Sequence, residues 1–137
     1  MATTTIGQSV HAQQDKAVQQ AYTLLHLAFF FAPVIAGLDK FTNLLVDWSS
    51  YIAPAVLNLL PFSGDVFMYI VGVVEIVAGI VVLLRPRFGG YLVAVWLWGI
   101  ILNLLLVPGF FDVALRDFGL SLGALALARL SEGLNKP

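Results

Sequence analysis

The stretch that decides the fold is "YIVGVVEIVAGIVVLL", which runs from Tyr69 to Leu84 and is apolar except for Glu75 near its middle. Together with the residues back to Val66 it is long enough to cross a bilayer, because a spanning helix needs about 20 mostly apolar residues. A lone charge at mid-membrane costs about 3 kcal/mol or more, so such a residue normally faces other protein groups and finds a partner. The stretch therefore predicts a membrane helix with one inward-facing carboxyl group.

The composition of the whole chain agrees with a membrane location. Of its 137 residues, 60% are hydrophobic and only 11% are charged, whereas a soluble domain carries about 25% charged residues. A chain this short could not bury so much apolar surface in a core of its own. The formal net charge of -1 does not indicate nucleic acid as a partner. With no cysteine, disulfides, thiol catalysis and cysteine-ligated metal centres are excluded, and no metal site is expected.

The apolar segments predict an all-α, polytopic membrane protein, built as a four-transmembrane-helix bundle. The expected spans are 21–38, 66–84, 89–107 and 112–130, of which the last is the weakest because charges lie in its first two turns. The stretch "YIAPAVLNLLPF" at 51–62 predicts a short interfacial segment between helices 1 and 2. The domain organisation follows: a polar N-terminal tail at 1–20 that frays before a short interfacial helix, a transmembrane domain at 21–131, and a C-terminal tail at 132–137.

The distribution of Lys and Arg predicts the orientation, since cytoplasmic loops carry an excess of both. With cytoplasmic N- and C-termini, five cations lie inside (Lys16, Arg85, Arg87, Arg129 and Lys136) and two lie outside (Lys40 and Arg116). Depth along the helices, at about 1.5 Å per residue, then places the polar intramembrane residues in the outer half. This predicted polar cluster, a candidate ligand-binding site, consists of Asp39, Lys40, Asn43, Glu75, Asn103, Arg116 and Asp117.

Helical phase predicts that each helix turns small and polar residues toward its neighbours. Gly72, Glu75 and Gly79 share one face at helical spacing, and so do Trp96, Gly99 and Asn103. Small residues let membrane helices approach closely. A compact bundle with polar groups converging in its outer half is the expected result.

Each buried polar residue has more than one interpretation. Glu75 can pair with Lys40 or with Arg116, can carry a proton, or can line a wet cavity; the pair is favoured because both cations lie on its side of the membrane. Arg116 is expected to contact Asp39 or Asp117. Asn103 is more typical of an interhelical hydrogen bond than of a ligand group. His26 has no second histidine at membrane depth, which favours a packed or hydrogen-bonded side chain over a haem ligand.

The order of three elements resembles the DoxX-like family of small four-helix bacterial membrane proteins. These are G-x-x-K at Gly37–Lys40, G-x-x-E-x-x-x-G at Gly72–Gly79, and Arg116–Asp117 at the start of the last helix. The resemblance implies a multi-pass protein of the bacterial cytoplasmic (inner) membrane. That family includes a small subunit of a thiosulfate:quinone oxidoreductase and members associated with oxidative or thiol stress, although most members have no assigned activity.

Two classes of function follow from the resemblance and the residues. The first is a redox-associated accessory subunit that gives a partner access to quinone or binds a small oxyanion at the polar cluster. Quinone is then the only cofactor to consider, and no other is evident. The alternative is a non-enzymatic structural or anchoring subunit of a larger membrane complex. In both cases the expected partners are the lipid bilayer and another protein or a second copy, and an accessory role is favoured over an independent enzyme.

Overall fold

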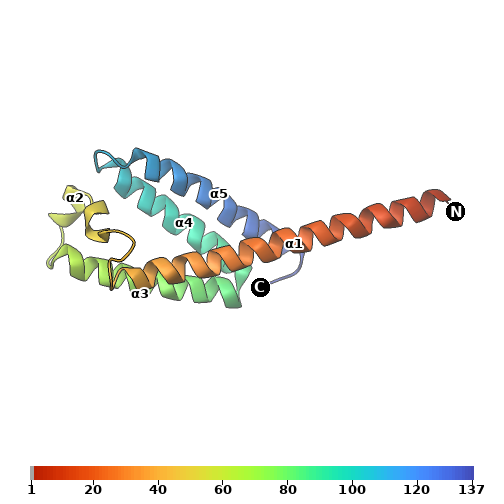
Figure 1. Ribbon diagram of the computed structural model, residues 1–137, viewed down its shortest axis with the longest axis horizontal. Coiled ribbons are helices and arrows are strands. Elements are labelled where there is room, and N and C mark those ends of the chain that lie inside the picture. Colours follow the sequence, from red (N-terminus) through yellow and green to blue (C-terminus); the bar gives the residue numbers. More distant parts are fainter. Residues whose placement is uncertain (1) are drawn as a thin grey trace.

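The computed structural model describes residues 2–137, with side chains from Thr5 onward, and all of its regular elements are helical. In chain order these are α1 (Ala2–Asp39), the 3-10 helix η1 (Trp48–Tyr51), α2 (Pro54–Leu57), α3 (Gly64–Leu84), α4 (Pro86–Leu105) and α5 (Phe111–Gly133). Figure 1 shows the long helices running side by side, with η1 and α2 at one end and the α3–α4 connection at the other. The expectation of an all-α fold is confirmed.

Three helices, α1, α3 and α4, are long and apolar enough to cross a membrane. Helices α3 and α4 have 21 and 20 residues, which at about 1.5 Å per residue matches a hydrocarbon core of about 30 Å. Many of their large apolar side chains face outward, as Val73, Val77, Val95 and Leu102 do. These features make the chain a membrane protein with lipid as its surroundings. Helix α5 has 23 residues but carries more charge.

Local sequence signals explain where α3 and α4 begin and end. The hydroxyl of Ser63 accepts a hydrogen bond from the backbone N–H of Val66, which caps the start of α3. Arg85 precedes Pro86 and leaves the helical region at φ -137° and ψ 75°, as expected for a residue before proline. Pro86 then occupies the first turn of α4, where its missing N–H does no harm. The two helices are therefore joined by one residue.

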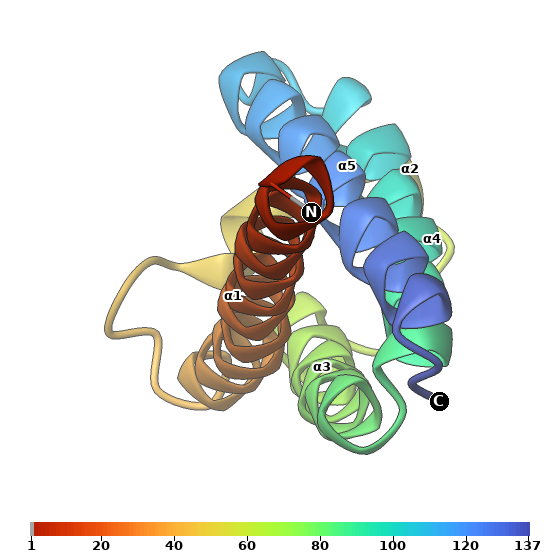
Figure 2. The same ribbon diagram turned by 90° about the vertical axis from the view of Figure 1, so that its right-hand side faces the viewer.

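The helices pack in pairs, α1 against α3 and α4 against α5, with α3 also contacting α4 (Figure 2). Glycines make the closest approaches. A Cβ atom on Gly37 would lie 2.6 Å from the carbonyl oxygen of Gly72, and a Cβ on Gly72 would lie 2.7 Å from the carbonyl oxygen of Gly37. Gly99, by contrast, is exposed with open space around it, so the prediction that it faces its neighbours is wrong.

Helix α1 differs from the expectation for the first twenty residues. Apart from Met1, which lies outside the described residues, the stretch is not a frayed tail with a separate short helix. It continues the first apolar segment as one helix of 38 residues, and Figure 1 shows it projecting beyond the other helices. The physical reason is that the apolar part supplies an already formed helix, so extension avoids the cost of nucleation. We call residues 2–20 the N-terminal arm.

Removing residues 2–15 should leave the helix bundle intact. From Thr5 to Asp15 every residue is exposed except Gly7, which is half-buried, and along the described part of α1 the first buried residue is Tyr22. The free energy of unfolding should change by about 0.5 kcal/mol or less, as for other surface changes. Thermal unfolding in detergent, followed by circular dichroism, measures this. A clear loss of stability would mean that the arm packs on the bundle.

Candidate functional site

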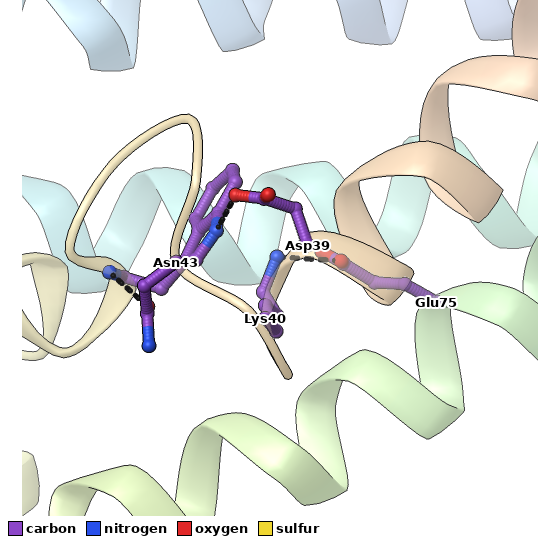
Figure 3. A network of polar contacts seen from close by, with 5 residues as sticks. Asp39, Lys40, Asn43 and Glu75 are labelled. Carbon is purple, nitrogen blue, oxygen red and sulfur yellow. Dashed lines mark hydrogen bonds and ion pairs between the residues drawn. The ribbon is translucent and has the colours of Figure 1, made fainter.

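A buried ion pair joins α1 to α3 at the end of the bundle that carries η1 and α2 (Figure 3). The ammonium nitrogen Nζ of Lys40 donates to Oε2 of Glu75 at 2.6 Å. Lys40 is 4% exposed and Glu75 is 8% exposed. Each residue lies three positions beyond a glycine of the Gly37–Gly72 contact, so the close helix approach brings the two side chains together.

The Lys40 ammonium has a second neighbour in Trp48, at the start of η1. Nζ lies 3.8 Å from the centre of the Trp48 ring, well within the range of a cation–π interaction. The indole N–H of Trp48 donates to Oδ2 of Asp39 at 2.8 Å. The Trp48 ring therefore covers the Lys40 ammonium, and its indole N–H connects the ion pair to the loop through Asp39. Trp48 was not among the residues of the predicted polar cluster, because its spacing from Lys40 along the chain does not indicate this contact.

The Asp39 carboxylate organises the loop that follows α1. Besides the Trp48 indole, it accepts hydrogen bonds from the Thr42 hydroxyl at 2.9 Å and from the backbone N–H groups of Leu44 and Leu45 at 3.1 and 3.0 Å. A carboxylate at a helix C-terminus is unfavourable for the helix dipole, and these four donors offset that cost. Asn43 adopts a positive φ of 53°, and its side-chain oxygen accepts a hydrogen bond from the backbone N–H of Trp48 at 3.2 Å.

Asn103 holds a different part of the loop region. Its amide oxygen accepts from the backbone N–H of Ala53 at 2.9 Å, and its amide nitrogen donates to the carbonyl of Tyr51 at 2.7 Å. It thus fastens the η1–α2 junction to α4 through backbone groups. Asn103 was expected to form a hydrogen bond between helices, but it bonds instead to the backbone of the loop region.

Arg116 and Asp117 form a pair of neighbours on α5. Both Nε and Nη2 of Arg116 lie 3.2 Å from Oδ1 of Asp117. The Arg116 side chain is 65% exposed whereas that of Asp117 is 7% exposed. The guanidinium therefore lies at the surface, and of the two cations considered for Glu75 it is Lys40 that forms the pair.

Of the seven residues in the predicted polar cluster, four belong to one connected network. Asp39, Lys40, Asn43 and Glu75 are linked directly or through Trp48, as Figure 3 shows. The others, Asn103, Arg116 and Asp117, make the separate contacts described above. We call Asp39, Lys40, Asn43, Trp48 and Glu75 the polar network.

Trp96 on α4 is a further residue beside the network. Its indole N–H is buried, lies close to the Glu75 carboxyl group, and forms no hydrogen bond that meets normal distance and angle limits. Its ring also lines an apolar groove between α3 and α4, with Val73, Val77 and Leu92. The sequence placed Trp96 on an inner face but did not connect it with Glu75.

His26 is accounted for by the fold. Its Nε2 lies 2.9 Å from the carbonyl oxygen of Val82 and 3.1 Å from that of Leu83, so it caps the last turn of α3. The expectation of a hydrogen-bonded histidine is confirmed. Among the residues that the structure describes, no three His, Asp or Glu side chains are grouped in a way that could hold a metal ion.

Together these features define a class: an all-helical membrane protein with a buried ion pair between its first two long helices. No protein-family model, curated protein or solved structure matches this chain.

Proposed function

We propose that the protein is a DoxX-like accessory subunit of the bacterial inner membrane, which anchors a partner protein without catalysing a reaction itself. The observation that carries this proposal is α1. One unbroken helix of 38 residues joins an apolar segment to the polar N-terminal arm, whose side chains from Gln8 to Gln20 are all exposed. The arm is mostly polar but also exposes Ile6, Val10 and Val18. Helical stability in proteins comes mostly from packing against other groups, and a contact with another component would stabilise the arm.

The polar network supports an accessory role. The Lys40 ammonium contacts both Glu75 and Trp48, and the Asp39 carboxylate accepts four hydrogen bonds from its own loop. These contacts fix the positions of α1, α3 and the loop relative to one another. They are not held ready for a substrate, which favours a structural use of the charges over catalysis.

A four-helix membrane bundle with both termini in the cytoplasm is part of the proposal. Helix α5 packs along α4 and buries Ala114, Asp117, Ser121, Ala124 and Leu127 on its inner face. Its exposed cation Arg129 is paired with Glu132 near the helix end, which lowers the cost of placing α5 across a bilayer. The five-to-two division of Lys and Arg supports a cytoplasmic location for the N-terminal arm.

Single cysteines test this topology, because the chain contains none of its own. In intact cells, an impermeant thiol reagent should label Asp47→Cys, whereas Phe88→Cys and Asn135→Cys should react only after permeabilisation. Labelling of Asn135→Cys from outside, with Phe88→Cys still protected, would mean that α5 does not cross. Labelling of Phe88→Cys from outside would reverse the orientation.

Gentle purification from the native membrane tests the anchoring role. The full-length protein should retain a partner in fixed stoichiometry, and the variant lacking residues 2–15 should lose it while keeping its thermal stability. Arg129→Gln, at an exposed site outside the arm, is the matched control and should retain the partner. If the same proteins accompany the full-length and shortened chains, the arm does not anchor them.

A second candidate function is access for a quinone or small oxyanion next to Glu75, and Trp96 is the observation that favours it. Its buried N–H lies near the Glu75 carboxyl group but forms no hydrogen bond of normal geometry; a poorly satisfied donor is costly, and a carbonyl or oxyanion would improve its bonding. Protein purified in mild detergent should then contain bound quinone, and Trp96→Phe should lose it without losing stability. If quinone is absent, and no added oxyanion raises the thermal stability of the wild-type protein more than that of Trp96→Phe, this candidate fails.

A further inference from the structure

The connection between α3 and α4 carries two arginines that form no ion pair with the described side chains. Arg85 is the single residue between the helices, and Arg87 lies in the first turn of α4. Both are exposed. Among the side chains described from Thr5 onward, the ion pairs join Lys40 to Glu75, Arg116 to Asp117 and Arg129 to Glu132. Within the part of the chain whose side chains are described, neither arginine therefore has a carboxylate at ion-pair distance.

The helix ends beside these arginines do not bind them either. An arginine near a helix C-terminus commonly bonds to the last carbonyl groups, but His26 already contacts the carbonyls of Val82 and Leu83. Arg87 lies near the positive end of the α4 dipole, where an anion is favoured and a cation is not. The backbone N–H of Phe88 in that turn donates to the terminal oxygen of Pro137 at 3.3 Å. The two guanidinium groups therefore remain available to bind an anion.

The level of the connection in the membrane indicates which anion is nearby. Helices α3 and α4 are both apolar enough to span, so their one-residue connection lies at the edge of the hydrocarbon. Leu84 is 67% exposed and Phe88 is 58% exposed on either side of the arginines. Apolar side chains at this depth contact acyl chains, and the guanidinium groups next to them reach the level of the lipid phosphates.

We propose that Arg85 and Arg87 bind the phosphate of an anionic phospholipid, with Leu84 and Phe88 against its acyl chains. Guanidinium groups suit this role because their planar N–H donors match phosphate oxygens in pairs. A cation close to an anionic membrane surface contributes about fivefold to binding. Two such residues should therefore favour an anionic over a zwitterionic phospholipid by about 25-fold.

The test uses the full-length protein in detergent micelles, where sidedness in the membrane plays no part. Phosphatidylglycerol and phosphatidylcholine of the same acyl composition are titrated separately, and bound lipid is counted by native mass spectrometry. The wild type should retain phosphatidylglycerol about 25-fold better, and the preference should fall with added salt. Arg85→Gln/Arg87→Gln should abolish the preference, and Arg116→Gln, which changes an exposed arginine at the other end, should keep it.

Three results would overturn the proposal: an equal affinity of the wild type for both lipids, an unchanged preference in Arg85→Gln/Arg87→Gln, or equal loss in Arg116→Gln. Inorganic phosphate at millimolar concentration is a further control, because displacement of the lipid by it would indicate a site for free anions. Should the double glutamine variant not fold, Arg85→Lys/Arg87→Lys replaces it. That variant keeps the charge and loses paired hydrogen bonding, so a preference equal to that of the wild type contradicts guanidinium recognition.

Discussion

Glu75→Gln should lower the free energy of unfolding by about 3–5 kcal/mol, the usual cost of removing one partner from a buried ion pair. The amide keeps the shape of the carboxyl group but leaves the Lys40 ammonium uncompensated, at 4% exposure. Lys40→Met should lower the free energy of unfolding by a similar amount, because it leaves the Glu75 carboxylate without a counter-charge and also removes the contact with the Trp48 ring. Thermal or denaturant unfolding in a fixed detergent measures both.

A double-mutant cycle separates pairing from other effects of these substitutions. Glu75→Gln combined with Lys40→Met should cost much less than the sum of the two, since neither charge is then left alone. The same cycle with Arg116→Met should give a coupling energy near zero, because the Arg116 guanidinium contacts Asp117 and is largely exposed. Arg129→Gln, in an exposed pair, should cost less than about 1 kcal/mol. A coupling energy near zero between Glu75 and Lys40 would rule out the pair as a stabilising contact and favour a protonated Glu75.

Gly72→Leu should prevent α1 and α3 from packing as they do. A Cβ atom there would lie 2.7 Å from the Gly37 carbonyl oxygen and 3.2 Å from Lys40 Cβ, and the first of these neighbours is backbone that cannot rotate away. The expected cost is at or above the upper end of the usual range of about 1–3 kcal/mol for overpacking. Because the two helices would separate, the Lys40–Glu75 pair should be lost as well.

The matched control for this substitution is Gly99→Leu. Gly99 is also a helical glycine in an apolar segment, but nothing lies within 4 Å of a Cβ atom built on it. Leucine there should be neutral or slightly stabilising, since glycine is a poor helix former. Folded yield and thermal stability in detergent compare the two variants. Equal stability of Gly72→Leu and Gly99→Leu would show that the close approach of α1 and α3 is not required.

The sequence by itself determined the features that depend on composition over one helix or one connection. The apolar length of Val66–Leu84 predicted the α3 span, and helical spacing predicted that Gly72, Glu75 and Gly79 share a face. All three are buried. These properties are local, because a helix of given length has a known rise and phase whatever its neighbours are.

Only the tertiary structure decided which groups meet. The sequence left both Lys40 and Arg116 open as partners for Glu75, although Arg116 was expected to contact Asp39 or Asp117. The approach of Gly37 to Gly72 brings α1, not α5, against that face of α3. Asn103 turns to the η1–α2 backbone, and Trp48 covers the ion pair from a loop. Such contacts depend on the rotation and separation of whole helices and on where a loop folds back. Spacing along one helix does not determine these, because each is set by packing between segments that lie far apart in the chain.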